Sequence, residues 1–272
     1  MFFPARPISR ACIENHYPER QTQLNSPESF NPTTNRNLKS NRFAERWSIL
    51  CLLLAPLAYF GYRYIADHVS VLTGAMLYYA YSIPIVYAPA LVFLGMMFFI
   101  QKKALFRELT FFGNFCWKDL VYGLSAVTIL YIAVYLTAHL LGNPREPSMV
   151  MFYAFKTNSQ IAILLFTVLL LPPIVEELLY RHFILTSVPV FKGKITPALA
   201  ILLTAALFSM AHKYEYQLTY ISLFLVGIIF GVARVRSKGL LLPIMLHMYA
   251  IGFVLLGDQV AKHIEIAQQM GR

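Results

Sequence analysis

The sequence predicts an all-α protein, a polytopic bundle of seven to eight transmembrane helices. Three observations support this class: among 272 residues, 58% are hydrophobic, only 13% are charged, and the apolar residues gather in long runs. A helix needs about 20 apolar residues to cross a bilayer. Runs of this order fall at 47–65, 71–100, 117–141, 159–188, 196–212, 217–233 and 240–257. So much apolar sequence excludes an ordinary soluble domain.

Residues 1–45 are polar and rich in Asn, Ser and Pro. Such a segment buries too little apolar surface to fold, so we expect a disordered cytoplasmic tail. It lacks the apolar core and the small-residue cleavage site of a secretory signal. Membrane insertion is therefore expected to begin at the span near Trp47.

The formal net charge of +10 is explained by topology, so nucleic acid is not expected as a partner. Basic residues cluster before the first span and after the second, fourth and sixth, all on one side of the membrane. The clusters are Arg36, Lys39, Arg42 and Arg46; Lys102, Lys103 and Arg107; Lys192 and Lys194; and Arg234, Arg236 and Lys238. The positive-inside rule then predicts a cytoplasmic N-terminus, in a bacterial cytoplasmic membrane.

Ionisable side chains divide the spans into two groups. Residues 46–145 carry hardly any at depth and are expected to be scaffold helices. From 146 to 260 they recur in or beside spans, where they are unfavourable and mark function. They are Glu176, Glu177, Arg181, His182, His212 and His247. We expect 146–260 to be the catalytic bundle and 261–272 to be a C-terminal tail.

Two adjacent carboxylates, Glu176 and Glu177, follow Pro172-Pro173 in the fourth span. Proline has no backbone donor and clashes one turn back, so this pair is expected to break the span and start a new helical segment. Glu177 shares a helix face with Arg181, four residues on, in the favoured order for an ion pair. Glu176 points elsewhere and is left free to act as a general base.

A purely structural function of the doublet stays open. Both glutamates would then pair with Arg181 or His182 and lock helices together. Gly227 and Gly231 form a GxxxG pattern, which predicts close helix packing and says nothing about catalysis.

Two later spans each supply a histidine. Phe208 precedes His212 by one helical turn, so its ring is expected to limit the imidazole rotamers. An interfacial function of His212, beside Lys213 and Glu215, is the alternative. His247 lies about 10 Å inside the last span, where an imidazole needs a polar partner, either in a site or in a simple helix-to-helix hydrogen bond.

Glu176, His212 and His247 could supply the His2Glu ligands of a catalytic zinc ion. The sequence has no HExxH motif and no two histidines four residues apart, so we expect no cofactor and keep zinc as the less favoured alternative. The span boundaries place His212 at the non-cytoplasmic end, Glu176 near mid-membrane and His247 toward the cytoplasm. The three are therefore expected at different depths unless helices are tilted or broken.

Taken in order, three motifs resemble the CPBP family of intramembrane endopeptidases, which includes type II CAAX prenyl proteases and abortive-infection (ABI-like) proteins. The motifs are EExxxR from Glu176 to Arg181, FxxxH from Phe208 to His212, and a proline-preceded histidine at His247. The resemblance covers about 155–255. It implies that Glu176 and His212 activate a water molecule and that His247 stabilises the oxyanion. It also implies supporting residues, which are Glu177, Arg181 and Phe208.

The chain departs from the family pattern at Ile251. The family has Asn or Asp four residues after the last histidine, whereas isoleucine neither donates nor accepts a hydrogen bond. One oxyanion donor typically contributes about a hundredfold to a thousandfold in rate. Tyr249, Ser209 or a backbone amide is a possible substitute, and the nearest acid is Asp258, about two turns further on.

The predicted function is an intramembrane endopeptidase that hydrolyses a peptide bond of a membrane-tethered protein or peptide within the lipid bilayer. Two other classes stay open. The Ile251 departure favours a weak or inactive relative that acts as a membrane scaffold, immunity protein or regulatory partner. Proton or cation transport would also use intramembrane carboxylates and histidines, but the sequence shows no inverted repeat. The sequence specifies neither the target peptide nor an oligomeric state.

Overall fold

The computed structural model describes residues 33–105, 111–188, 190 and 195–270, and all regular secondary structure in these ranges is helical. The all-α class is therefore confirmed. The chain divides into two units, residues 1–45 and 46–272. In the first unit, helix α1 already begins at Thr33, within the segment predicted to be a disordered tail, and residues 1–32 lie outside the described ranges.

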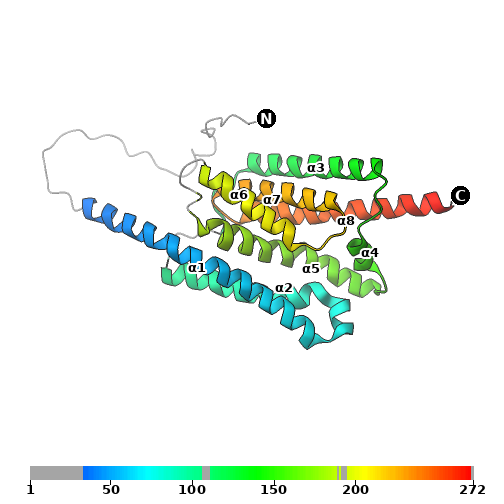
Figure 1. The fold of residues 1–272 in the computed structure, drawn as a ribbon, viewed down its shortest axis with the longest axis horizontal. Helices are drawn as coiled ribbons and strands as arrows, with labels where there is room; N and C mark the ends of the chain where they lie inside the picture. The colour runs from blue at the N-terminus through cyan, green and yellow to red at the C-terminus, as the bar shows by residue number, and fades with distance from the viewer. Residues whose placement is uncertain (1–32, 106–110, 189, 191–194, 271–272) are drawn as a thin grey trace. The chain divides into compact units, whose positions relative to one another are not determined.

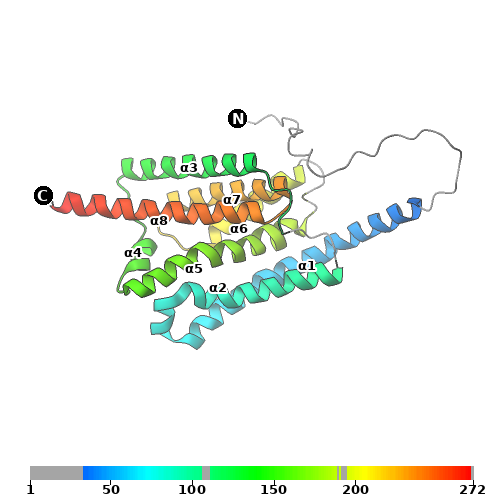
Figure 2. The same ribbon diagram turned by 180° about the vertical axis from the view of Figure 1, so that it is seen from behind.

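The helices follow one another with short connections. In chain order they are α1 (Thr33–Thr73), α2 (Ala75–Ile100), η2 (Gln101–Leu105), α3 (Trp117–Leu140), α4 (Pro147–Tyr153), α5 (Asn158–Glu176), η3 (Glu177–Ile184), η4 (Leu185–Ser187), α6 (Ile195–Ala211), α7 (Gln217–Ser237) and α8 (Leu241–Met270). The last of these continues through most of the predicted C-terminal tail. Helix α5 packs against α2 on one side and α8 on the other, and α7 contacts α3, α6 and α8 (Figures 1 and 2).

Five helical segments of the described chain are long and apolar enough to cross a membrane, so the predicted count of seven to eight is not confirmed. They are Ala75–Lys103, Trp117–Leu140, Asn158–Ser187, Gln217–Ser237 and Leu241–Met270. The other two predicted runs lie in α1, which carries Arg63 and Asp67, and in α6. Helix α6 has 17 residues, about 26 Å at the α-helical rise, which is shorter than the roughly 30 Å of a hydrocarbon core.

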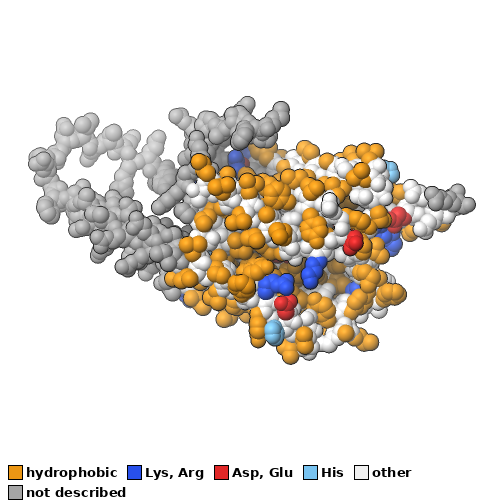
Figure 3. Space-filling view, viewed as in Figure 1, with side chains coloured by type: hydrophobic (Ala, Val, Ile, Leu, Met, Phe, Trp, Pro, Cys, Tyr) orange, Lys and Arg blue, Asp and Glu red, His pale blue; other side chains and the backbone are white. Residues whose placement is uncertain are grey.

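The surface fits a lipid environment. Large apolar side chains are exposed along the helices, and the face in Figure 3 is mostly hydrophobic with few charged groups. Lipid tails are as apolar as these side chains, so helix association in the bilayer depends on close packing and polar contacts. The protein is an integral membrane protein, as its composition predicts.

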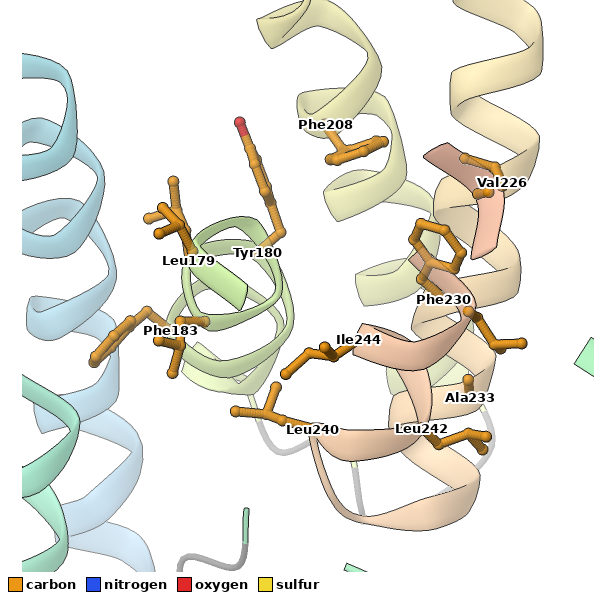
Figure 4. Packing of buried hydrophobic residues seen from close by; sticks show 14 of the residues in the cluster. Leu179, Tyr180, Phe183, Phe208, Val226, Phe230, Ala233, Leu240, Leu242 and Ile244 are labelled. Carbon is orange, nitrogen blue, oxygen red and sulfur yellow. The ribbon is translucent and has the colours of Figure 1, made fainter. Parts of the chain in front are cut away.

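The core lies where η3 meets α6, α7 and the start of α8. In Figure 4, Leu179 and Phe183 extend from one side of η3, whereas Leu240 and Ile244 pack on the other. This helix is therefore enclosed on several sides, and the side chains that it carries at 177–183 are all buried.

The GxxxG pattern has the packing function predicted from sequence. A Cβ atom added at Gly231 would lie 2.9 Å from Cγ2 of Ile201, and one at Gly227 would lie 3.1 Å from Cβ of Ala205. The first distance is shorter than real Cβ contacts and the second is tight, so the two glycines allow α7 to approach α6 closely.

Arg145, between α3 and α4, holds the far end of α8. Its Nε and Nη2 donate to the two carboxylate oxygens of Asp258 at 2.8 and 2.7 Å, and Nη1 lies 3.6 Å from Glu265. The hydrogen bonds with Asp258 raise the pKa of Arg145, so the guanidinium stays charged at every working pH. Asp258, the nearest acid after Ile251, is therefore committed to a structural contact.

Replacing Arg145 with Met is expected to lower the free energy of unfolding by about 3 kcal/mol, because it leaves the buried Asp258 carboxylate without its partner. Thermal unfolding of the purified protein in detergent measures this change. The matched control is Asp67→Asn, which breaks a 3.4 Å pair with Arg63 whose side chains are 44% and 61% exposed. That loss should stay within about 0.5 kcal/mol. Equal losses in the two variants would contradict a structural clamp at Asp258.

Candidate active site

Pro172 and Pro173 do not break the fourth span, contrary to the prediction. Both lie inside α5, which continues directly into η3. Neighbouring helices can satisfy the carbonyl groups that a proline leaves free in a membrane helix, so such prolines are tolerated. The departure from α-helical geometry comes later, at Glu177, where the hydrogen bonds widen to a π pattern. The N–H of Leu185, for example, donates to the carbonyl of Tyr180.

Glu176, His212 and His247 come together, although the sequence predicted different depths. Oε2 of Glu176 lies 3.9 Å from Nε2 of His212 and 3.7 Å from Nε2 of His247. The predicted depths were wrong because α6 is short and ends at Ala211, so the next residue, His212, need not reach the membrane edge. Three helical segments that are distant in sequence thus contribute to one cluster.

The imidazole of His212 is fixed by its own helix end. Nδ1 lies 2.8 Å from the carbonyl oxygen of Phe208, and the two rings pack edge to face with centroids 4.7 Å apart. A carbonyl oxygen only accepts, so Nδ1 carries the hydrogen and the neutral ring presents the Nε2 lone pair toward Glu176. The rotamer restraint predicted from the FxxxH spacing is present.

The loop after His212 is held in place by Glu146. Its carboxylate accepts hydrogen bonds from the backbone N–H groups of Glu215 and Tyr216, both at 3.2 Å. Tyr214 stacks on the His212 ring, with centroids 5.9 Å apart. Burial, with the nearby carboxylates of Glu176 and Glu146, raises the pKa of Tyr214 to about 12. Its hydroxyl therefore stays neutral throughout the range in which imidazoles titrate.

Glu177 and Arg181 form the predicted pair in the fully buried interior. Nε of Arg181 lies 3.3 Å from Oε2 of Glu177. The guanidinium also donates from Nη2 to the carbonyl of Gly227 at 3.1 Å and lies 4.6 Å from the ring centroid of Phe208. Oε1 of Glu177 accepts a 3.0 Å hydrogen bond from Nδ1 of His247. Glu177 therefore has the structural function that was considered for both glutamates. It also orients His247.

Glu176 has a different environment from its neighbour. Its Oε1 accepts a 2.7 Å hydrogen bond from the hydroxyl of Tyr87 in α2. Its Oε2 is buried and accepts no hydrogen bond from the described side chains, while it faces the two imidazoles. The carboxylate is therefore held by one oxygen and leaves the other available for chemistry.

Glu176 and His212 line a small cavity of about 80 Å³. Its other walls are Arg63, Ala211 and four tyrosines, which are Tyr59, Tyr62, Tyr87 and Tyr180. Several of these residues come from α1 and α2, which the sequence predicted to be scaffold only. The tyrosines in these apolar helices could have indicated that they line a site, because a buried hydroxyl usually has a hydrogen-bond partner.

The two side chains suggested as substitutes for the missing oxyanion donor are engaged elsewhere. The Tyr249 hydroxyl lies 2.6 Å from Oγ1 of Thr128, and Oγ of Ser209 donates to the carbonyl of Tyr220 at 2.7 Å. Buried His182 is also outside the cluster, since its Nε2 lies 2.7 Å from Oε1 of Gln101. None of these side chains supplies a second donor beside His247.

The separations within the cluster are wider than those of a tetrahedral zinc site. In the part of the chain that the structure describes, no group of three or more His, Cys, Asp or Glu side chains is placed to hold a metal ion. Ligand atoms at about 2.1 Å around a tetrahedral zinc ion would lie roughly 3.4 Å from one another. Oε2 of Glu176 is 3.7 and 3.9 Å from the two imidazole nitrogens.

Residues 158–251 match the sequence model of the type II CAAX prenyl endopeptidase Rce1-like family. This segment is an Rce1-like domain. It contains the three motifs and ends at Ile251, so the resemblance to the CPBP family is confirmed. The Rce1-like family is one of CAAX-type proteases, which supports a protease at the family level.

A curated relative extends the comparison beyond the domain. A protein of Escherichia coli described as an uncharacterized 24.3 kDa protein is 41% identical over 129 residues. The match covers 46% of this chain and 58% of the relative, somewhat more than half of that protein's length. No solved structure matches the chain significantly.

Proposed function

We propose that the protein is an intramembrane endopeptidase that hydrolyses a peptide bond of a membrane-tethered protein or peptide. The observation that carries this proposal is the arrangement around Glu176, whose buried Oε2 faces the imidazoles of His212 and His247 at the wall of a cavity. The Rce1-like match supports a protease and gives no support to a scaffold without turnover.

In the proposed reaction, Glu176 and His212 activate a water molecule. Oε2 of Glu176 takes one proton, while the Nε2 lone pair of His212 accepts a hydrogen bond from the other O–H. The water oxygen bonds to the peptide carbonyl carbon, and the carbonyl electron pair moves onto its oxygen. When the tetrahedral intermediate collapses, the C–N bond breaks and Glu176 returns its proton to the leaving amine.

His247 stabilises the oxyanion in this proposal. Its Nδ1–H is used by Glu177, so Nε2 can donate only when the ring is an imidazolium. The carboxylate of Glu177 lies 3.0 Å from Nδ1 and orients the ring. A preorganised donor of this kind typically contributes about a hundredfold to a thousandfold in rate.

The proposed orientation places the N-terminus in the cytoplasm of a bacterial cell. The basic residues in η2 and those at the end of α7 then lie on the cytoplasmic side. Arg107, Lys192 and Lys194, which the same argument uses, lie outside the described residues.

Cleavage by the purified full chain in detergent tests the function. Lipid-tethered peptides of varied sequence are incubated in heavy-oxygen water, and mass spectrometry locates any heavy oxygen in a new carboxylate. We expect incorporation with wild type and none with Glu176→Gln. Intact peptides throughout would contradict hydrolysis, and stoichiometric zinc with activity lost on chelation would contradict the metal-free mechanism.

Replacing Ile251 with Asn is expected to accelerate cleavage by about tenfold or more, because it restores a second donor one helical turn from His247. The measured quantity is kcat for the best cleaved peptide. Ile251→Leu, which adds no donor, serves as the matched control and should keep the wild-type rate. An Asn variant that folds and does not exceed the Leu variant would show that position 251 does not reach the oxyanion.

Replacing Tyr87 with Phe is expected to reduce kcat by about tenfold to a hundredfold with little change in KM. The hydroxyl positions Glu176 without touching substrate in this mechanism, and a hydrogen bond to a charged group contributes about 1.5–3 kcal/mol. Tyr59→Phe lines the same cavity and provides the control, with kcat close to wild type. A rise in KM alone for Tyr87→Phe would contradict the positioning function.

A further inference from the structure

Glu146 lies between α3 and α4 and is the N-cap residue of α4, which Pro147 begins. A polar side chain at an N-cap commonly accepts a hydrogen bond from the first N–H groups of its own helix. Within the described range of α4, the carboxylate of Glu146 makes no such bond. It bonds instead to residues 69 to 73 positions further along the chain, around the start of α7.

These bonds supply a cap that α7 does not make for itself. In the described helix α7, the N-cap residue Tyr216 makes no capping bond with its own side chain. Oε1 of Glu146 accepts from the N–H of Tyr216 at 3.2 Å and also from the hydroxyl of Thr219. Oε2 accepts from the N–H of Glu215 at 3.2 Å. A carboxylate at this end of a helix is also favoured by the helix dipole, so α7 is capped by a residue of another segment.

The capped segment is close to the site along the chain. Only residues 212–216, the α6–α7 connection, separate the end of α6 from the start of α7. Tyr214, in the middle of this connection, is held by the hydroxyl of Tyr220, which accepts from its N–H at 3.2 Å and donates to its carbonyl at 3.1 Å. The Tyr214 ring stacks on that of His212 with an angle of 7° between the planes. A shift at the start of α7 would therefore move the ring that lies against the imidazole.

The geometry of His212 depends on this stacking. Its side chain is 23% exposed and lines the cavity. The contact of Nδ1 with the carbonyl of Phe208 fixes one edge of the imidazole, and the Tyr214 ring lies against one face. Nε2 lies 3.9 Å from Oε2 of Glu176, so a small rotation of the ring would displace it from a water molecule that both groups contact. A misplacement of about 1 Å can cost about a hundredfold in rate.

We propose that Glu146 is a positioning residue for the hydrolysis, because it holds the α6–α7 connection and thereby keeps Tyr214 against the ring of His212. This inference rests on the proposed function. It assigns a function to a part of the chain outside the Rce1-like match, which begins at residue 158. Glu146 acts through His212 and does not touch the reacting atoms.

The kinetic test compares Glu146→Gln with Glu265→Gln in the full chain. Glutamine keeps the size of the side chain, but its NH2 group cannot accept a hydrogen bond from a backbone N–H. For Glu146→Gln we expect kcat for the best cleaved peptide to fall by about tenfold to a hundredfold, with KM unchanged. Glu265→Gln makes the same change at a side chain that is 44% exposed and lies beside Arg145, the preceding residue. Its kcat should stay at the wild-type value.

A second comparison separates positioning from a general loss of stability. Effects of groups that act as a unit are not additive. In the His212→Ala background, Glu146→Gln should therefore cause no further loss of kcat. Tyr214→Leu should behave like Glu146→Gln, whereas Tyr214→Phe keeps a stacked ring and should lose less. An equal loss from Glu146→Gln with and without His212 would overturn the inference, because Glu146 would then act on the fold alone.

Chemical modification of His212 tests the inference without any peptide. Diethyl pyrocarbonate attacks the imidazole nitrogen that carries no hydrogen, here Nε2, and mass spectrometry follows each histidine. We expect His212 to react severalfold faster in Glu146→Gln than in wild type, while exposed His263 reacts at the same rate in both. If Glu146→Gln lowers the folded fraction, Thr219→Val takes its place. It removes one of the donors and should give a smaller change in the same direction.

The kinetic and modification results separate the two proposals. Faster modification of His212 with no cleavage of any peptide would support the contact that Glu146 maintains and contradict the hydrolase. An unchanged rate of modification, or an unchanged kcat where wild type cleaves, would overturn the positioning function and leave the hydrolase standing.

Discussion

Replacing Glu176 with Gln is expected to reduce kcat by about a thousandfold or more. Glutamine has the same shape, and its amide oxygen can still accept the hydrogen bond of Tyr87, so the cavity should keep its form. The amide does not take a proton from water, and the loss of a general base typically costs about a hundredfold to ten-thousandfold in rate. The measurement is single-turnover cleavage of the best tethered peptide, with thermal unfolding recorded on the same sample.

Glu177→Gln provides the matched control, because its carboxylate has a structural environment. Arg181 and His247 both use it in a fully buried setting, so neutralising it should destabilise the protein by about 3 kcal/mol. The expected contrast is a stable, inactive Glu176 variant and an unstable Glu177 variant. A Glu176→Gln protein that cleaves at the wild-type rate would exclude this carboxylate as the base.

Replacing His212 with Ala is expected to reduce kcat by about a hundredfold to a thousandfold, because the activated water loses an acceptor. Added imidazole should restore part of this activity. The side chain of His212 is 23% exposed and lines the cavity, so its removal opens space that a small ring can enter. The dependence of kcat on imidazole concentration measures the rescue.

His247→Ala tests whether such rescue is specific to the cavity. This side chain is only 6% exposed and lies against Phe230, with ring centroids 4.9 Å apart. We therefore expect a comparable loss of rate without recovery. Equal rescue of the two variants would show that imidazole acts from solution, and no rescue of His212→Ala would argue against the proposed access.

The fold class and the central cluster could be predicted from the sequence because both depend on local patterns. Long apolar runs specify membrane helices, and the spacings around Glu176, His212 and His247 identify residues that apolar helices rarely carry. The pairing of Glu177 with Arg181 followed from the separation of four residues, which a widened helix still brings into contact.

The parts that could not be predicted depend on tertiary contacts. Tyr87 binds Glu176 across 89 positions in the chain, and nothing adjacent to it in sequence marks it among the other tyrosines. The run 196–212 matched α6 to within one residue at each end, but the sequence did not show that this short helix leaves His212 beside Glu176. Pro172 and Pro173 were misread because proline rules describe an isolated helix, whereas these residues are buried among other helices.

The change from α to π winding at Glu177 has a consequence for how the chain tolerates insertions and deletions. Residues four apart share a helix face, so a single residue added or removed between Glu177 and Arg181 would turn Arg181 away from its acid while the preceding prolines stayed in place. Segments before and after this stretch can vary in length, because loops absorb the difference. The number of residues between the acidic doublet and Arg181 therefore matters to the site as much as the side chains do.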